Sequence, residues 1–443
     1  MKTLVKNVTI VSDHEKKVSD VLVSDFRFEK IDSVIDVKAD VEIDGTGLVM
    51  LPGVIDTHVH FREPGYTNKA TILSESSAAV AGGVTSFMDM PNTKPDATSL
   101  DVLEEKYKLA SQSSMANYSF YLGTNGYNIE EIKRMNRNTI CGVTDDGLYF
   151  KDGALCNRPD LLEKVMKSTD AIVALHCEQE DIIAKTSSVF KFSLRNAITP
   201  EKHTMFRSRE ACFEASKKVV ELAKETGARV HLLHLSTMDE LALLEDSPLS
   251  KNKRITAEIC LPHLMFSYNN YKELGYKMKV NPSIKLESDR QKLIAALLTN
   301  KIDTIGSDHA PHLLSEKEGG YDEVKSGMPG VGHSLLSLLE KYKKGIISLE
   351  QVVNKMCHNP ANLFQILERG YIREGYFADF VLVDMNANEV KPSISYACGW
   401  SPYEQTTYST QIKATFVNGV QAYSEGRVQA LPAGMRLHFA VEN

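Results

Sequence analysis

The strongest constraint on the fold is a repeated alternation between short apolar, β-rich runs and helical stretches. Helical patterns lie between several of these runs, for example over residues 209–226, followed by Gly227, and over residues 287–299. Strands that alternate with helices predict right-handed βαβ units and a parallel sheet. We expect strands over residues 53–59, 83–89, 117–122, 139–144, 171–176, 229–235, 255–260 and 302–307.

Eight such units over about 310 residues predict a (β/α)8 TIM barrel with insertions. The alternative is a doubly wound open sheet, which would want a Gly-rich phosphate turn after its first strand, and none follows there. The two chain ends differ, because residues 1–50 and 371–430 carry short alternating strands. Neither end can close a core alone, so we expect a barrel domain over residues 51–370 and one small β-sandwich domain built from residues 1–50 plus 371–443.

Composition excludes several classes of protein. With 51 Lys+Arg against 58 Asp+Glu, a net charge of −7 and 42% hydrophobic residues, the chain has the composition of a globular protein without a nucleic-acid footprint. No run approaches the roughly 18 apolar residues of a membrane span, and the N-terminus alternates like a strand and lacks the apolar core of a signal peptide. The seven cysteines are scattered without a CxxC pair, which is typical of reduced thiols. We therefore expect a cytoplasmic protein without membrane or nucleic-acid partners.

The first predicted barrel strand ends in a His-x-His pair, His58 and His60. Residues two apart in a strand share a face, so both imidazoles can reach one metal ion. Two packed or surface histidines are the alternative, because so short a motif also occurs by chance.

Other predicted strands end in the same kinds of residue. His176 ends the fifth strand, His231 and His234 lie near the end of the sixth, and Asp308 follows the eighth. In a regular strand residues three apart face opposite ways, so we expect His234, nearer the carboxyl end, to be the ligand, and His231 to be packed or buried between strand and helix. Barrel enzymes have their active sites at the carboxyl ends of the strands, where these residues lie.

Four histidines and one aspartate exceed the three protein ligands usual for one catalytic zinc, so the set predicts two Zn²⁺ ions. Such a pair wants a bridging carboxylate, and the segment Thr144-Asp145-Asp146-Gly147 after the fourth strand offers one. The same tripeptide Asp-Asp-Gly also favours an ordinary turn.

Several motifs together resemble a dihydroorotase of the amidohydrolase superfamily. They are LPGVIDTHVHFREPG (51–65), AGGVTSFMDMPNT (81–93), HCE (176–178), HLST (234–237), VNPSIK (280–285), SDHAPH (307–312) and ADFVLVD (378–384). The resemblance covers essentially the whole chain. It implies a (β/α)8 barrel, a binuclear zinc site and reversible cyclisation of N-carbamoyl-L-aspartate to L-dihydroorotate in pyrimidine synthesis, with a possible homodimer.

Carried over by position, the resemblance also implies roles for individual residues. His58, His60 and Asp308 would hold one zinc, and His176 and His234 the other. Arg62, Asn92 and His312 would hold the substrate's α-carboxylate, with Asn281 near the ring edge, and Asp308 would act as the catalytic base.

One departure from the family pattern concerns the metal bridge. Many members bridge the metals with a carboxylated lysine in a Lys-x-Phe run, whereas that position here is Thr144. A second dihydroorotase pattern uses an aspartate of a Thr-Asp-Asp-Gly segment, so we expect Asp146 to be the bridge. Lys151 lies too far beyond the strand to substitute.

Three functions remain open. An active zinc dihydroorotase is favoured by Arg62, since a guanidinium grips a carboxylate with two parallel hydrogen bonds; a structural salt bridge is the alternative role of this arginine. A hydantoinase- or allantoinase-like cyclic amidase would act on neutral rings instead. The missing lysine motivates the third, a catalytically silent assembly partner.

Residues 313–333 are charged and poorly periodic, and predict either a mobile lid or a passive surface excursion.

Overall fold

The computed structural model describes residues 1–194 and 198–441, with only the backbone of residues 191–194. Within this part, parallel strands close a barrel, and each predicted barrel strand is confirmed, most with shorter bounds. The barrel strands are β6 (Val54–Val59), β7 (Val84–Asp89), β8 (Asn117–Phe120), β9 (Leu122–Gly123), β10 (Gly142–Thr144), β11 (Ile172–Leu175), β12 (Val230–Leu232), β13 (Ile255–Cys260) and β14 (Thr304–Gly306).

The order of pairing shows how the barrel closes. Strands β6, β7 and β8 form one parallel set, and β9 to β14 form another in chain order. β8 and β9 are two parts of one strand interrupted at Tyr121. Past the end of β14, His309 bridges Val59 in parallel and accepts the backbone N–H of His60 at 2.7 Å. The ring therefore closes next to the His-x-His pair.

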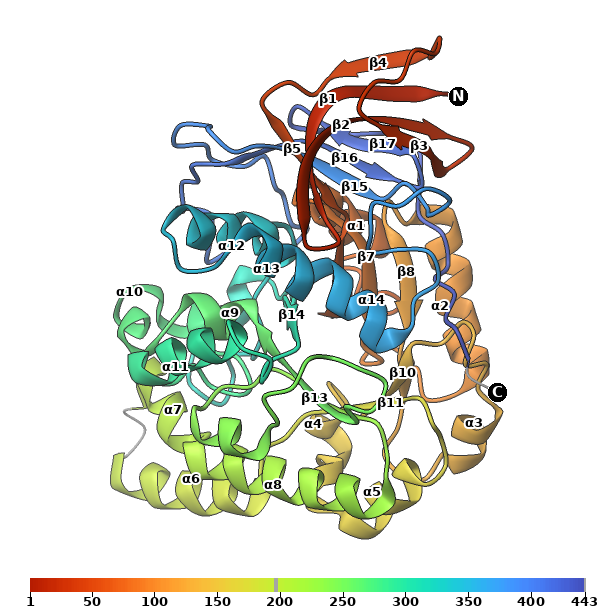
Figure 1. The fold of residues 1–443 in the computed structure, drawn as a ribbon. Coiled ribbons are helices and arrows are strands. Elements are labelled where there is room, and N and C mark those ends of the chain that lie inside the picture. The colour runs from red at the N-terminus through yellow and green to blue at the C-terminus, as the bar shows by residue number, and fades with distance from the viewer. Residues whose placement is uncertain (195–197, 442–443) are drawn as a thin grey trace.

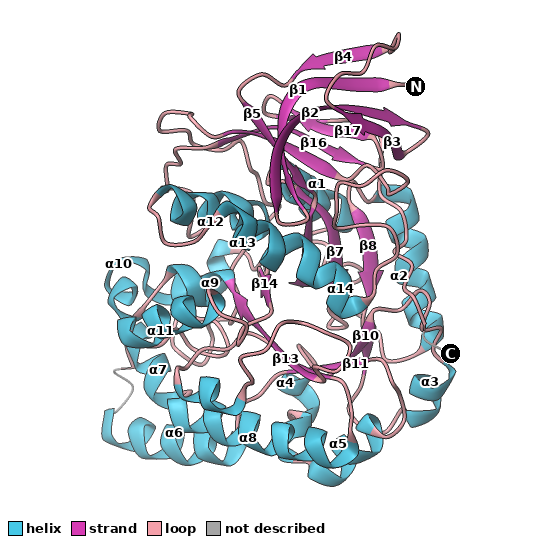
Figure 2. Ribbon diagram, viewed as in Figure 1, coloured by secondary structure: helices cyan, strands magenta, loops and turns pink. Residues whose placement is uncertain are grey.

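Helices enclose these strands on the outside (Figure 2). They are α1 (Ile72–Ala81), α2 (Leu100–Ser113), α3 (Ile129–Arg134), α4 (Tyr149–Asp152), α5 (Pro159–Met166), α6 (Glu180–Leu194), α7 (His203–Phe206), α8 (Arg209–Thr226), α9 (Leu261–Met265), α10 (Tyr271–Leu274), α11 (Glu287–Leu297), α12 (Ser334–Lys343), α13 (Leu349–Val353) and α14 (Asn359–Phe364). The two helices predicted from periodicity, α8 and α11, are confirmed. Ser208 caps the start of α8, and Gly227 ends it in the left-handed conformation, φ 70°.

Both chain ends build one additional β-sheet, as predicted. Its strands are β1 (Thr3–Ser12), β2 (Glu15–Ser24), β3 (Arg27–Asp32), β4 (Val41–Asp44), β5 (Leu48–Pro52), β15 (Phe380–Asp384), β16 (Gln411–Val417), β17 (Val420–Ser424) and β18 (Arg427–Val428). β5 pairs antiparallel with β15, so the N-terminal and C-terminal strands, red and blue in Figure 1, are hydrogen-bonded into one continuous sheet. One of its apolar clusters draws on both ends, with Phe28 packed near Phe380 and Phe380 stacked on Phe416.

The C-terminal segment then leaves this sheet and returns to the barrel. It runs down beside α2 (Figure 1), and Arg436 pairs there with Glu104. Tyr118 of β8 donates its N–H to Met435 and accepts the N–H of Leu437. The segment thus pairs with β8 where β8 and β9 separate. Among the described residues, no helix combines the length and apolar character needed to cross a membrane.

Candidate functional site

Five side chains predicted as metal ligands meet at the carboxyl end of the barrel. His58 and His60 lie at the end of β6, His176 follows β11, His234 follows β12, and Asp308 follows β14. All five are buried. Arg62, His234 and Asp308 hold positive φ angles of 69°, 35° and 47°, a conformation that L-residues adopt rarely and that clusters at functional sites.

Asp146 lies in the middle of this cluster, and its two oxygens face different histidines. Oδ2 lies 3.4 Å from His58 Nε2 and 3.3 Å from His60 Nε2. Oδ1 lies 3.6 Å from His176 Nδ1 and 3.7 Å from His234 Nε2. One carboxylate therefore connects two pairs of imidazoles, which is the arrangement that a bridging ligand requires.

Asp308 completes the half of the cluster that contains the His-x-His pair. Its Oδ1 lies 3.5 Å from His58 Nε2 and 3.2 Å from His60 Nε2. On the other half, His176 Nδ1 lies 3.1 Å from His234 Nε2. The two halves are thus His58, His60 and Asp308, and His176 and His234, with Asp146 shared.

These separations fit a metal better than a network of hydrogen bonds. Two ligands at roughly 2.0–2.1 Å from one tetrahedral ion lie about 3.3–3.4 Å apart, whereas nitrogen–oxygen hydrogen bonds are usually about 2.9–3.0 Å long. The nitrogen–oxygen separations between the histidines and the two aspartates run from 3.2 to 3.7 Å. His58 Nε2 and Asp146 Oδ2 are buried without a hydrogen-bond partner in the described part of the chain. Imidazole and carboxylate donors are those that Zn²⁺ prefers.

The outward ring nitrogens of three of these histidines have partners of their own. His58 Nδ1 lies 2.6 Å from Glu258 Oε1, and His176 Nε2 lies 2.9 Å from Glu178 Oε2. His60 Nδ1 lies 2.8 Å from Asn92 Oδ1. Such partners fix the tautomer of a metal-binding histidine and the orientation of its ring.

Electrostatics keep the carboxylates of the cluster ionised. Burial alone would raise the pKa of Asp146, but the nearby imidazoles of His176, His234 and His58 outweigh burial and hold this pKa well below its usual range. Burial likewise disfavours ionised Glu178, yet the Arg207 guanidinium and His176 lower its pKa. Asp145 differs, since burial raises its pKa to about 6.

The neighbours of Asp146 have structural duties. Asp145 accepts the backbone N–H of Leu155 at 2.7 Å and that of His176 at 3.1 Å. Thr144 accepts the N–H of Asp146 through Oγ1 at 3.0 Å and so shapes the turn that presents it. Lys151 is exposed and pairs with Asp96 at 2.6 Å, so it does not enter the cluster.

A pocket of about 410 Å³ opens over the cluster, and one corner of it is cationic. Arg62 is buried there, and donates from Nε to the Pro311 carbonyl at 3.1 Å, and its Nη2 lies 3.2 Å from His312 Nε2. Lys69 Nζ lies 3.2 Å from His312 Nδ1 and 2.7 Å from Glu316. Burial, together with the charge of Arg62, lowers the pKa of His312 to about 3, so this ring is neutral near pH 7.

Asn92 and Asn281 line the same pocket from other sides. Asn281 donates from Nδ2 to the Tyr149 hydroxyl at 3.3 Å and accepts the Ser326 hydroxyl at 3.1 Å. Tyr149 stacks on His176 with ring centroids 3.8 Å apart. The structure thus brings Arg62, Asn92, Asn281 and His312 together around one cavity beside the metal cluster.

Residues 313–333, for which sequence left a lid and a passive surface loop open, form one wall of this pocket. Lys325, Ser326 and Gly327 line it. The buried Lys317 donates from Nζ to the carbonyls of Lys279, Lys325 and Gly327 at 3.0, 2.7 and 2.9 Å. In this structure the segment is therefore tied down over the pocket.

The prediction that His231 and His234 face opposite ways is wrong, but His234, the one nearer the carboxyl end, is the histidine that lies in the cluster, as expected. β12 ends at Leu232 and His234 has a φ of 35°, so the regular alternation stops before His234. His231 is buried as expected, but its ring contacts Thr256 and Glu258 on the neighbouring strand β13 and Thr304 on β14, the next strand along.

Several residues at the site were missed by sequence reasoning. Glu258 had a signal, because it is a charged residue in the middle of an otherwise apolar strand, and Glu178 lies two residues after His176. Lys69 and Tyr149 gave none, since their positions depend on loops whose course no periodicity predicts.

The fold and the site together define a class: barrel hydrolases with a histidine–carboxylate centre at the carboxyl ends of the strands. Residues 49–422 match the model of the amidohydrolase family. The dihydroorotase of Lactococcus lactis subsp. lactis (strain IL1403) is 31% identical over 96% of this chain and 99% of that protein. The dihydroorotase of Methanosarcina acetivorans is 30% identical over 90% of this chain and 87% of that protein.

Among solved structures, the L-hydantoinase (dihydropyrimidinase) from Arthrobacter aurescens superimposes with a TM-score of 0.90 and 26% identity, over 98% of this chain and 99% of that one. The chain belongs to the amidohydrolase family. Its dihydroorotase and hydantoinase relatives mark it, within that family, as a cyclic amidohydrolase.

Proposed function

We propose that the protein is a zinc-dependent dihydroorotase, which interconverts N-carbamoyl-L-aspartate and L-dihydroorotate. The observation that carries this proposal is the cationic corner formed by Arg62 and Lys69 beside the metal cluster. A cyclic amide that also bears a carboxylate would place its charged group against the Arg62 guanidinium and its ring amide against the cluster. The dihydroorotase relatives support the same substrate class.

In this proposal His58, His60 and Asp308 would hold one zinc ion, His176 and His234 would hold the other, and Asp146 would be the ligand that both share. When bound, the two ions supply a water of lowered pKa and polarise the amide carbonyl. The protein supplies the fixed directions of the ligand atoms, since Glu258, Asn92 and Glu178 hold the outward ring nitrogens.

Asp308 is the base in our proposal. Burial disfavours its ionised form, but the neighbouring imidazoles of His58 and His60 outweigh burial and lower its pKa, so the carboxylate is ready to accept a proton. It takes a proton from the attacking water and returns it to the ring nitrogen when the amide bond breaks. In the biosynthetic direction Asp308 takes the proton from the nitrogen that closes the ring and returns it to the departing water.

The other pocket residues orient the substrate. Arg62 would bind the α-carboxylate through its fork of N–H donors. Asn92 already accepts from His60 through Oδ1, so Asn92 Nδ2 remains as the donor to that carboxylate. His312 is neutral and therefore adds no positive charge at this point. Asn281 lines the same pocket, hydrogen-bonded to Ser326, and would contact the ring edge. We further propose a cytoplasmic enzyme of pyrimidine synthesis, acting as a homodimer.

A hydantoinase activity is the second candidate, favoured by the likeness to the L-hydantoinase fold. The deciding experiment measures turnover of dihydroorotate, carbamoyl-aspartate and hydantoin by the purified protein, together with its zinc content. We expect two zinc ions per chain and preference for the acidic substrates, and Asp146→Asn should lose at least one ion and nearly all turnover. Better turnover of hydantoin would favour the second candidate. Zinc binding without turnover would indicate the silent assembly partner.

A further inference from the structure

We propose that Glu258 is a positioning residue that holds both halves of the metal centre, an inference that rests on the proposed function. Glu258 lies in the middle of β13 and is completely buried. Its Oε1 contacts His58 Nδ1 at 2.6 Å, and its Oε2 accepts the Thr57 hydroxyl at 3.3 Å. One carboxylate on β13 is thereby connected to the His-x-His strand, β6.

The contact with His58 is a hydrogen bond and leaves no room for a metal ion. His58, Glu258 and Cys260 group closely enough to suggest a metal site of their own. However, two ligands of one tetrahedral zinc lie about 3.3–3.4 Å apart, and His58 Nδ1 is only 2.6 Å from Glu258 Oε1. The proton between these atoms must belong to Nδ1, because an ionised carboxylate only accepts.

The position of this proton determines which ring nitrogen of His58 can bind a metal. With the proton on Nδ1, the lone pair of His58 is on Nε2, which faces Asp146 at 3.4 Å and Asp308 at 3.5 Å. A neutral imidazole binds a metal only through its unprotonated nitrogen. Glu258 therefore keeps His58 in the tautomer that serves as a ligand.

Glu258 also reaches the other half of the centre. Its Oε1 accepts the backbone N–H of His234 at 3.3 Å, and its own carbonyl accepts the N–H of Leu235 at 3.0 Å. His234 sits just past the end of β12 with a φ of 35°, so its backbone is not held by regular strand pairing. Side chain and main chain of Glu258 together supply that restraint.

Charge and space at this point agree with a positioning role. Among the described residues, the ion-pair partners of Glu258 are the histidines His58 and His231, and neither lysine nor arginine reaches it. A buried carboxylate is costly unless a positive charge offsets it, and the cations of the proposed centre, acting through His58, would do so. Gly306 on β14 makes the room, because a Cβ there would come within 2.8 Å of Glu258 Oε2.

The test compares zinc retention by the parent holoenzyme and by Glu258→Gln, with a chromogenic chelator competing for Zn²⁺. Glutamine keeps the shape and an acceptor but loses the charge. Loss of an outer partner typically weakens metal binding about 10- to 100-fold, and we expect that loss here. The rise in unfolding temperature that added zinc produces should shrink in parallel. Glu258→Asp, which keeps the charge but withdraws the carboxylate from His58, should weaken zinc binding too and serves if the glutamine variant does not fold.

Asp303→Asn is the matched control. Asp303 is a buried carboxylate directly before β14, paired with Lys253 at 2.8 Å and accepting the N–H of Ala257 in β13. Its loss should lower stability without changing zinc affinity. Zinc retention by Glu258→Gln within about threefold of the parent, or an equal loss in Asp303→Asn, would overturn the positioning role. A parent protein that binds no zinc would instead overturn the proposed function.

Discussion

Arg62 is the side chain whose replacement separates an acidic substrate from a neutral ring. Arg62→Lys keeps the charge but loses the planar fork, so one charge-assisted hydrogen bond to the carboxylate is lost. Such a bond contributes about 1.5–3 kcal/mol, which predicts a fall of about 10- to 150-fold in kcat/KM for dihydroorotate, chiefly through KM. Steady-state kinetics with dihydroorotate and hydantoin measure it.

Hydantoin turnover is the internal control for that variant, since a neutral ring has no carboxylate for Arg62. It should change by no more than about threefold, and so should both activities in Arg134→Lys on the exposed side of α3. An equal loss for dihydroorotate and hydantoin would mean that Arg62 acts through the fold, by its bond to the Pro311 carbonyl, and not by gripping substrate.

His203 makes the stability of the chain depend on pH. Its ring is buried between the Tyr321 hydroxyl and the Val280 carbonyl, each at 2.7 Å, and burial lowers its pKa to about 3. Below the unfolded value of about 6.5 the unfolded chain binds a proton that the folded chain does not, so stability is lost as pH falls from 6.5 towards 3. Between pH 7.5 and 5.5 this group should remove about 1 kcal/mol from the free energy of unfolding.

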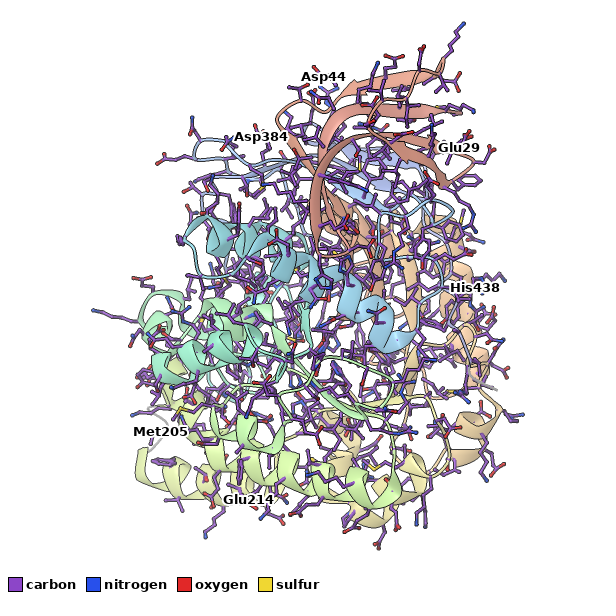
Figure 3. The ribbon with its side chains drawn as sticks, in the orientation of Figure 1. Glu29, Asp44, Met205, Glu214, Asp384 and His438 are labelled. Atoms are coloured by element: carbon purple, nitrogen blue, oxygen red, sulfur yellow. The ribbon has the colours of Figure 1, made fainter. Side chains whose placement is uncertain are left out.

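Urea denaturation of the parent and of His203→Gln at those two pH values tests this. Glutamine can still donate to the Val280 carbonyl but does not titrate, so the variant should lose about 1 kcal/mol less than the parent on acidification. His438 provides the control, since it is exposed at the edge of the molecule (Figure 3), and His438→Gln should keep the parent's pH dependence. Equal pH dependence in all three proteins would contradict the prediction.

At the scale of elements, the segment 313–333 depends on one buried ammonium. Lys317→Met would leave the carbonyls of Lys325 and Gly327 without this donor, at about 1–3 kcal/mol for each buried group left unsatisfied, while the Lys279 carbonyl keeps the N–H of Gly327. We expect a clearly lower Tm, and a KM that rises more than kcat falls, because Ser326 and Gly327 of this segment line the pocket. Thermal unfolding and steady-state kinetics check both effects.

Lys344→Met replaces an exposed lysine just after α12 and should leave Tm and KM unchanged. A Lys317→Met enzyme with the parent's KM would show that the segment does not need its clamp to form the pocket wall.

The barrel strands and the helices α8 and α11 could be predicted because local periodicity and caps fix them. The segment of Asp145 and Asp146 could be singled out because it follows a strand directly, and the choice of Asp146 came from the resemblance to the dihydroorotase pattern. Where an element stops being regular, prediction failed: the facing of His231 and His234 followed strand alternation beyond Leu232, where β12 had already ended. The pairing of Glu258 with His58 joins residues 200 positions apart, and no pattern within either strand encodes it.

At the scale of the whole molecule, the C-terminal segment connects the terminal sheet to the barrel. It contacts the barrel at β8, and none of its described residues lines the substrate pocket. Leu437 and Phe439 are buried, and Met435 and Leu437 provide the backbone partners of Tyr118 in β8. Deleting residues 434–443 would expose β8 and lose two apolar side chains, each contributing about 1.5–3 kcal/mol. We expect the free energy of unfolding to fall by at least about 3 kcal/mol.

The candidate site itself should survive this deletion at 25 °C, because the lining of the pocket draws on residues 60–327. Zinc content should stay at the parent value and kcat/KM within about threefold, while Tm falls. Leu437→Ala should reproduce part of the loss, about 2–5 kcal/mol for a buried leucine, and Leu431→Ala, at a side chain 77% exposed, should cost nothing measurable. A truncated chain with the parent's Tm would show that the segment does not stabilise the fold. A truncated chain that loses zinc at 25 °C while still folded would show that the segment supports the metal centre.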